Sequence, residues 1–248
     1  MVKVVAHRGF SGKYPENTEI AFREAIELGV EMIEFDVHLA KDGALIVIHD
    51  ATVNRTSNGK GRIADMTLAE IKALDAGAWL KPEFAGQRFP TLQEALDLMG
   101  GKVRLNIHVK AYPNDAERLV PSVVRELQAR NLLDKSFVAS DQEYIALARR
   151  IEPRLGICNL STTPKETYVS RSDSIGCRIL QPGNKQVDKA LVDDAHAYGM
   201  EVNPFYADDE AEMRRLIECG VDGILTNYPD RLQQVRWISD QSSVTSDQ

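Results

Sequence analysis

Short apolar runs alternate along the chain with segments whose apolar residues recur at helical spacing. Most of the apolar runs are continuous, which is typical of strands covered on both faces in a parallel sheet. Regular alternation of strands and helices on this scale predicts an α/β protein. We expect strands at residues 2–6, 31–36, 45–48, 103–109, 137–140, 156–160, 177–180, 201–205 and 221–226.

The segments between these strands carry signals for helices. Residues 18–28 place apolar side chains at helical spacing. Two capping boxes, Thr67 with Glu70 and Thr91 with Glu94, predict where two more helices begin. Further helical patterns cover about 115–130, 141–151, 186–198, 208–219 and 230–238.

The strand at 45–48 does not fit a parallel barrel, because too few residues precede it for a crossover helix. The dipeptide Asp42-Gly43 is instead a signal for a type I′ hairpin turn. Counting back from a two-residue turn at this dipeptide sets Asp36 opposite His49. With this strand assigned to an inserted hairpin, eight strands remain for the barrel.

We therefore predict a (β/α)8 TIM barrel with a small insertion, about residues 37–90, after the second strand. A single domain is expected to span 1–238 and to include the insertion. The last residues, 239–248, are polar and lack aromatic side chains, which predicts a disordered tail.

Charge and composition narrow the class of protein. The 248 residues include 37 acidic and 30 basic side chains, for a formal net charge of −7. This balance argues against sequence-independent binding to nucleic acid, and no apolar run is long enough for stable membrane association. Three separated cysteines and the lack of a signal peptide favour a cytoplasmic location. A homo-oligomer stays open.

Polar residues are concentrated at the predicted carboxyl ends of strands, where TIM barrels carry their working side chains. Burying such groups on separate strands costs free energy unless they are paired or bind a ligand. Their convergence therefore predicts a functional site. Its members are His7, Arg8, Glu34, Asp36, His49, His108 and Lys110.

The residue types indicate what this site handles. Arg8 and Lys110 are cationic donors suited to a phosphate group. Glu34 and Asp36 are two residues apart on one strand, so both carboxylates share a face and offer oxygen ligands to a divalent cation. The alternative is purely structural, with these carboxylates in ion pairs, for example Glu34 with Lys110.

Two histidines complete the expected chemistry. His7 and His49 are suited to act as general base and general acid on opposite sides of a phosphorus centre. With a cation and Arg8 on the phosphate oxygens, this arrangement defines a phosphodiesterase.

These residues lie in segments that resemble the glycerophosphodiester phosphodiesterase family, whose fold is a TIM barrel related to the phospholipase C type phosphodiesterases. The similar segments follow the family's order across about 225 residues of the chain. They are Ala6-His-Arg-Gly9, Pro15-Glu-Asn-Thr18, Ile33-Glu-Phe-Asp-Val37, Val47-Ile-His-Asp50, Arg55-Thr-Ser-Asn-Gly59, Thr67-Leu-x-Glu70, Pro90-Thr-Leu92 and Gly220-Val-Asp-Gly-Ile-Leu-Thr-Asn-Tyr-Pro229.

The resemblance implies hydrolysis of glycerophosphodiesters to sn-glycerol 3-phosphate and an alcohol. It implies that His7 and His49 are the catalytic pair, that Arg8 contacts the substrate phosphate, and that the metal ligands include the two carboxylates of the second strand. It also implies Mg²⁺ or Ca²⁺ as the cofactor, and the partner is a small-molecule glycerophosphodiester.

The chain departs from the family at two positions. Where the family carries a third metal-ligating Glu, this chain has His108, which removes one negative charge and favours Mn²⁺, Co²⁺ or Zn²⁺ relative to Mg²⁺ and Ca²⁺. Near the seventh barrel strand the family commonly has a Trp-Thr pair, and here Phe205 follows Pro204. We expect Phe205 to line the glycerol pocket, with plain core packing as the alternative.

Two other functions stay open from the sequence. His108 keeps open a phosphodiester-binding protein or a weakened enzyme. A metal-dependent barrel lyase or isomerase uses carboxylates and a Lys in a similar way, but it assigns no role to the pairing of His7 with His49.

Overall fold

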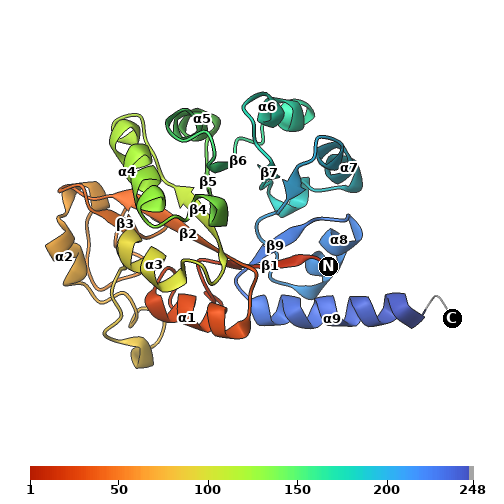
Figure 1. Cartoon of the computed structure of the whole chain (residues 1–248). Coiled ribbons are helices and arrows are strands. Elements are labelled where there is room, and N and C mark those ends of the chain that lie inside the picture. Colours follow the sequence, from red (N-terminus) through yellow and green to blue (C-terminus); the bar gives the residue numbers. More distant parts are fainter. Residues whose placement is uncertain (246–248) are drawn as a thin grey trace.

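Eight parallel strands form a nearly closed barrel in the computed structural model, in which the backbone is described for residues 1–245 and the side chains as far as Trp237 (Figure 1). The predicted (β/α)8 class is therefore confirmed. In spatial order the barrel strands are β8 (Glu201–Val202), β7 (Ile179–Leu180), β6 (Gly156–Asn159), β5 (Ser136–Ser140), β4 (Arg104–Val109), β2 (Met32–Leu39), β1 (Lys3–His7) and β9 (Gly223–Thr226).

The helices cover the outside of the barrel (Figure 1). Both predicted capping boxes form, with Thr67 before α2 and Thr91 before α3. The helices are α1 (Glu19–Leu28), α2 (Leu68–Lys72), α3 (Leu92–Met99), α4 (Ala116–Ala129), α5 (Gln142–Ile151), α6 (Tyr168–Ser174), α7 (Lys189–Ala197), α8 (Glu210–Glu218) and α9 (Pro229–Thr245). Of these, α6 was not expected, because its Ser and Asp residues compete with helix by bonding to nearby backbone.

Two hydrophobic cores result from the alternation of side chains along the barrel strands. One face of each strand packs against the surrounding helices and carries most of the buried apolar residues. The other face fills the barrel interior with a smaller cluster, formed by Val5, Met32, Phe137, Ala139, Cys158, Ile179 and Leu225. The polar residues at the mouth sit above this inner cluster.

The strand β3 (Leu45–Val47) pairs antiparallel with β2 and stands outside the ring, as the hairpin argument predicts. The predicted two-residue turn is wrong. The register pairs Leu39 with Leu45, and the backbone N–H of Gly43 bonds the carbonyl of Ala40. Only Gly43 of the predicted pair has a positive φ, of 91°, whereas a type I′ turn needs two such residues.

The loop is therefore one residue longer than predicted. Ile48, rather than His49, bonds the carbonyl of Asp36. A shift of one residue reverses the face of every side chain in the strand, so the tertiary packing of this segment decides which residues point to the mouth.

The insertion has a hydrophobic core of its own, separate from that of the barrel. Its buried residues come from the hairpin and from the irregular chain that follows it, and they are Ala40, Ile46, Ile48, Val53, Ile63, Ile71, Ala76 and Phe89. This small core holds the insertion as a compact unit beside the mouth of the barrel.

The strand β8 has only two residues, although we expected it to reach Phe205. Pro204 has no N–H and so cannot continue the ladder. Backbone bonds from Leu225 to the carbonyl of Pro204 and from Ala207 to the carbonyl of Leu225 link the chain after β8 to β9. The barrel is completed there by irregular backbone.

The helix α9 contains the predicted domain boundary at 238. Side chains beyond Trp237 are not described, and 246–248 lie outside the described residues. The domain limits and the disordered tail at 239–248 stay predictions.

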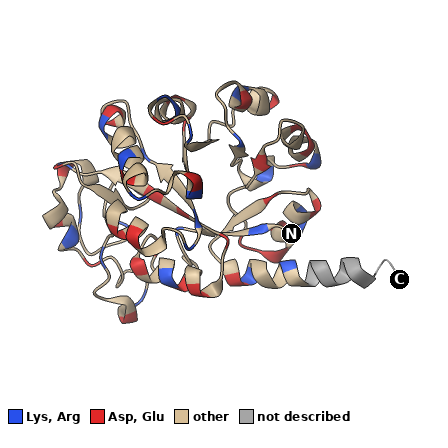
Figure 2. Ribbon diagram, viewed as in Figure 1, with Lys and Arg blue, Asp and Glu red and all other residues tan. Residues whose placement is uncertain are grey.

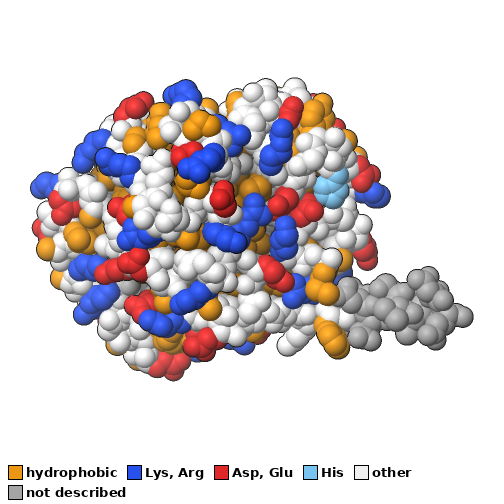
Figure 3. Space-filling model, viewed as in Figure 1, with side chains coloured by type: hydrophobic (Ala, Val, Ile, Leu, Met, Phe, Trp, Pro, Cys, Tyr) orange, Lys and Arg blue, Asp and Glu red, His pale blue; other side chains and the backbone are white. Residues whose placement is uncertain are grey.

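Charges of both signs are distributed over the helices, and they are interspersed on the face shown in Figure 3 (Figures 2 and 3). Within the described residues, no helix combines the length and apolar character needed to cross a membrane.

The insertion depends on a close backbone contact at Gly77. A Cβ at this position would lie 1.9 Å from the carbonyl oxygen of Phe84. We predict that Gly77→Ala lowers the free energy of unfolding by about 1–3 kcal/mol, because the backbone must move to admit the methyl group. Gly183→Ala is the matched control, since its Cβ would meet nothing closer than 3.6 Å. Equal denaturation midpoints for the two variants would contradict this account.

Candidate active site

The residues proposed from the sequence surround one cavity of about 120 Å³ at the carboxyl ends of the strands. All of them except Lys110 line it. The lining comprises His7, Arg8, Glu34, Asp36, His49, His108, Leu160, Gln181, Phe205, Tyr206 and Leu225.

The turn after β1 places Arg8 at this cavity. Arg8 has a φ of 59°, a left-handed conformation that costs free energy for a residue with a side chain. Its backbone N–H bonds the carbonyl of Glu34 at 2.8 Å, which holds the turn against β2. The next residue has to be glycine, because a Cβ at Gly9 would lie 2.8 Å from the backbone of Ala21. These neighbouring contacts thus hold Arg8 in its strained conformation. In this conformation its guanidinium lies at the cavity.

Glu34 and Asp36 are almost fully buried at the end of β2. Burial and the adjacent charge of Asp36 raise the pKa of Glu34. Burial would also raise the pKa of Asp36, but the close approach of the His108 imidazole and the charge of Lys110 hold it well below its usual range. Two buried carboxylates this close together therefore need positively charged groups nearby to compensate them.

Four side chains compensate Asp36 directly. Lys110 Nζ lies 3.0 Å and His108 Nδ1 lies 3.3 Å from Asp36 Oδ1. Asn17 Nδ2 donates to Oδ2 at 3.0 Å, and Arg8 Nε lies 3.5 Å from the same oxygen. The ion pair considered for Lys110 thus forms with Asp36 rather than with Glu34.

His7 is held by a chain of polar groups that leads to β9 and α8. Asn227 Nδ2 donates to Asp208 Oδ2 at 2.7 Å, so Asn227 turns its Oδ1 toward His7. His7 Nδ1 then donates to that oxygen at 2.8 Å, which leaves Nε2 without a proton in the neutral ring. The ring of Tyr206 stacks on His7 with centroids 5.2 Å apart.

The charge state of His7 follows from its surroundings. It is only 7% exposed, and Arg8 is its neighbour. Burial and the charge of Arg8 lower the pKa of His7 to about 4. The ring is therefore neutral at pH 7, with its unprotonated Nε2 on the side of Glu34, 3.9 Å from Oε2.

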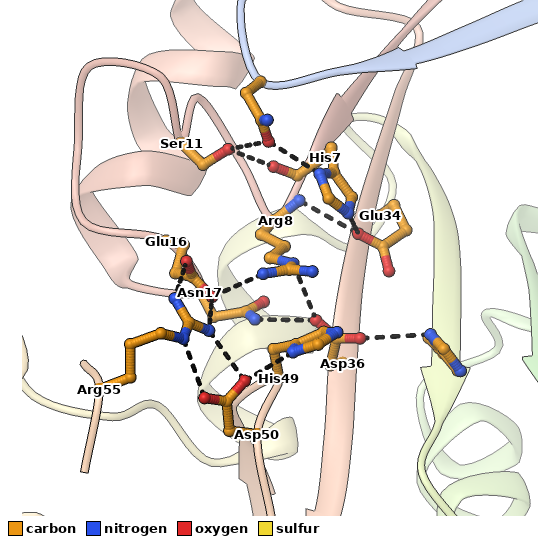
Figure 4. A network of polar contacts seen from close by, with 12 residues as sticks. His7, Arg8, Ser11, Glu16, Asn17, Glu34, Asp36, His49, Asp50 and Arg55 are labelled. Atoms are coloured by element: carbon orange, nitrogen blue, oxygen red, sulfur yellow. Dashed lines mark hydrogen bonds and ion pairs between the residues drawn. The ribbon is translucent and has the colours of Figure 1, made fainter. Parts of the chain in front are cut away.

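The inserted segment supplies His49 to the other side of the cavity (Figure 4). His49 Nδ1 donates to Asp50 Oδ1 at 2.7 Å, and the carbonyl of His49 lies 3.0 Å from the buried ring nitrogen Nε2 of His38. Hydrogen bonds, chiefly from Arg55, hold the pKa of Asp50 well below its usual range. His49 thus presents Nε2 to the cavity, as His7 does.

Glu34, Asp36 and His108 form a donor set that fits a divalent cation. One ligand atom from each lies within 4.8 Å of the others. Burial lowers the pKa of His108, so its ring is neutral and able to ligate. Asp36 Oδ1 is buried and accepts no well-directed hydrogen bond from the described residues, although Lys110 and His108 are near. Two carboxylates and one imidazole match the donors that borderline divalent metals accept.

Aromatic and amide groups form the remaining wall. Phe205 is 39% exposed and lines the cavity, so it is not a core residue. Gln181 accepts from Asn106 Nδ2 at 2.7 Å through its Oε1, and so its own NH₂ group faces away from that bond. The wall opposite the charged cluster is thus mostly apolar.

A larger hollow of about 560 Å³ lies between α1, α3 and the chain before α3. Its charged residues are already in ion pairs, for example Arg23 with Glu19 and Lys72 with Glu94. It brings no histidine or buried carboxylate together, so the smaller cavity is the chemical centre.

The fold and this cavity define a TIM-barrel protein with its polar site at the carboxyl ends of the strands. The glycerophosphoryl diester phosphodiesterase family model matches residues 7–231. A glycerophosphodiester phosphodiesterase of Caldanaerobacter subterraneus is 38% identical over 235 residues, covering 92% of this chain and 95% of that protein. One from Bacillus subtilis is 33% identical over 260 residues, covering 95% and 86%.

Solved structures of phosphodiesterases are also similar to this chain. A phosphodiesterase from Oleispira antarctica, in complex with the product sn-glycerol-3-phosphate, gives a TM-score of 0.89 at 29% identity, covering 94% of this chain and 96% of that one. A glycerophosphodiester phosphodiesterase from Agrobacterium tumefaciens gives 0.82 at 28% identity, covering 94% and 99%.

The chain belongs to the glycerophosphoryl diester phosphodiesterase family. Membership confirms the resemblance drawn from the sequence and the class of enzyme, a glycerophosphodiester phosphodiesterase. It does not favour the binding-protein or the lyase and isomerase alternatives.

Sequence reasoning missed the residues that orient the predicted ones. The sequence did contain a signal for most of these orienting residues, because they lie in the segments that resemble the family. Asn17 and Glu16 lie in the Pro15–Thr18 segment, Arg55 begins another, and Asn227 lies near the end of the last. The residues missed were Glu16, Asn17, Asp50, Arg55, Gln181, Tyr206, Asp208 and Asn227.

The tautomer of His7 is a direct consequence of its bond to Asn227. We predict that ¹⁵N NMR shows the neutral His7 ring protonated at Nδ1, and that Asn227→Leu shifts the ring toward the Nε2-protonated form because the acceptor is lost. Asn227→Asp, which keeps an acceptor, retains the Nδ1 proton. Protonation at Nε2 in the unsubstituted protein would refute this assignment.

Proposed function

We propose that this protein hydrolyses glycerophosphodiesters to sn-glycerol 3-phosphate and an alcohol, with His7 and His49 as the general base and general acid. The observation that supports this most is the pairing of two imidazoles across one cavity, each with Nδ1 bonded and Nε2 directed inward. Arg8 and the carboxylate cluster lie between them.

The first step is transfer of the phosphoryl group within the substrate. Neutral His7 takes the proton of the glycerol hydroxyl next to the phosphodiester, since its low pKa keeps Nε2 free. The hydroxyl oxygen attacks phosphorus, and His49 gives a proton to the leaving alcohol. Asp50 places negative charge beside His49 while that ring carries its proton.

The second step opens the resulting cyclic phosphate with water. His49, now neutral, accepts a proton from water, and His7 returns its proton to the glycerol oxygen. The products are sn-glycerol 3-phosphate and regenerated His7 and His49. Arg8 binds phosphate oxygens through both steps, and Lys110, paired with Asp36, supports the local positive potential.

The expected cofactor is a divalent cation bound by Glu34, Asp36 and His108. When bound, it supplies positive charge to the phosphate oxygens. The family resemblance favours Mg²⁺ or Ca²⁺, and the imidazole of His108 favours Mn²⁺, Co²⁺ or Zn²⁺. We expect Phe205 to contact the glycerol moiety from the apolar wall.

A direct assay tests the activity. Purified protein should release sn-glycerol 3-phosphate from glycerophosphocholine or glycerophosphoethanolamine, lose activity in EDTA, and regain it with a divalent metal. His49→Gln should lower kcat by about 10²–10⁴-fold through loss of proton transfer. His196→Gln is the control, because His196 pairs with Asp222 away from the cavity. Tight binding of a phosphodiester without turnover in any metal would favour the binding-protein alternative.

The choice of metal is tested at His108. His108→Glu adds a negative charge and an oxygen ligand, so we predict tighter binding of Mg²⁺ and Ca²⁺, by about tenfold, in titration calorimetry. Mn²⁺ and Zn²⁺ should gain less. The control His196→Glu should leave all affinities unchanged. If His108→Glu does not alter Mg²⁺ or Ca²⁺ affinity, His108 is not a ligand.

A further inference from the structure

Arg55, in the insertion, lies between two carboxylates and bonds both of them (Figure 4). Toward Asp50 it donates from Nε and Nη2, each at 2.9 Å. Toward Glu16 it donates from Nη1 at 2.7 Å and from Nη2 at 2.9 Å. One guanidinium therefore makes two forked ion pairs, which a Lys ammonium does not reproduce.

Each of these carboxylates holds a different group of the reaction. Glu16 Oε1 accepts from Arg8 Nη1 at 2.9 Å, and Asp50 Oδ1 accepts from His49 Nδ1 at 2.7 Å. Glu16 comes from the turn between β1 and α1, whereas Asp50 comes from the insertion. Arg55 is thus the only bridge among the described residues that bonds the carboxylate partners of both Arg8 and His49.

The charges explain why this bridge matters to Arg8. Glu16 is shared between two guanidinium groups, so it neutralises Arg8 only in part. Arg8 Nε is buried, makes no hydrogen bond to a described residue and lies 3.5 Å from Asp36 Oδ2, so Glu16 is the carboxylate that Arg8 contacts most closely. Without Arg55, the full charge of Glu16 falls on Arg8 and competes with an incoming phosphate.

A similar argument applies to His49. Asp50 is fixed on both oxygens by Arg55, and this fixes the direction in which it accepts from His49. Without Arg55, Asp50 is an unpaired carboxylate at a partly exposed position, free to rotate, and the ring of His49 loses its orientation.

We propose that Arg55 is a positioning residue for the diester hydrolysis, acting on phosphate binding through Glu16 and Arg8 and on proton transfer through Asp50 and His49. This inference rests on the proposed function. Four of its five N–H groups are committed to Glu16 and Asp50, so it acts through these carboxylates and does not contact substrate.

The test separates the two branches by combining substitutions. Arg55→Gln should raise KM and lower kcat for glycerophosphocholine, each by about tenfold or more, because small displacements of positioned groups reduce rates strongly. In a His49→Gln background the loss in kcat should disappear while the rise in KM remains. In a Glu16→Gln background the rise in KM should disappear. Arg55→Lys should restore KM and kcat only in part, relative to Arg55→Gln.

The control is Arg62→Gln, in the same insertion. Arg62 is exposed, and its side chain makes no hydrogen bond or ion pair to the described residues. It should leave kcat, KM and the melting temperature unchanged. If Arg55→Gln causes the same fold losses in every background, its role is merely structural and the proposal fails.

Titration with inorganic phosphate separates this proposal from the proposed function. Arg55→Gln should weaken phosphate binding by about tenfold, and Arg62→Gln should not. If the unsubstituted protein hydrolyses no glycerophosphodiester, the proposed function fails, and phosphate titration still decides the Arg8 branch. Equal phosphate affinity in Arg55→Gln and the unsubstituted protein would overturn that branch whatever the activity.

Discussion

The burial of two carboxylates on one strand is the constraint on which the rest of the site depends. Glu34 and Asp36 lie two residues apart on β2 and are almost inaccessible to solvent. Charges in such a position cost several kcal/mol each unless they are compensated. The turn after β1, the end of β4 and the loop before α1 all contribute groups that provide this compensation, through Arg8, Lys110 and Asn17.

The insertion supplies the half of the site that a plain barrel lacks. It packs on a hydrophobic core of its own, and this makes it rigid enough to carry His49. Besides the pairing of β3 with β2, an ion pair joins the two halves, between Arg55 of the insertion and Glu16 of the barrel. The barrel therefore holds the groups proposed to bind phosphate and metal, while the insertion holds one of the two histidines. The position of the insertion therefore determines where His49 lies relative to the residues of the barrel.

The two histidines are supported by partners of different charge. Asn227 is neutral and fixes the tautomer of His7, whose pKa is lowered by burial and by Arg8. Asp50 is an anion beside His49. This difference is the physical basis for proposing His7 as base and His49 as acid, because environment separates the roles of chemically identical groups. His108, partly buried and with a lowered pKa, offers a neutral donor to the proposed cation site.

The sequence by itself determined the barrel, the presence of an antiparallel hairpin after the second strand, and most of the charged and histidine side chains that line the cavity. These follow from local signals: continuous apolar runs, capping boxes, and polar residues placed at the ends of strands. Only the tertiary structure decided the hairpin register, the pairing of Lys110 with Asp36, the exposure of Phe205 and the partners of both histidines. The reason is distance along the chain, since His7 and Asn227 are 220 residues apart and no local spacing predicts their bond. Arg55 is a further case, because its bonds to Glu16 and Asp50 form only where two segments far apart in the sequence meet.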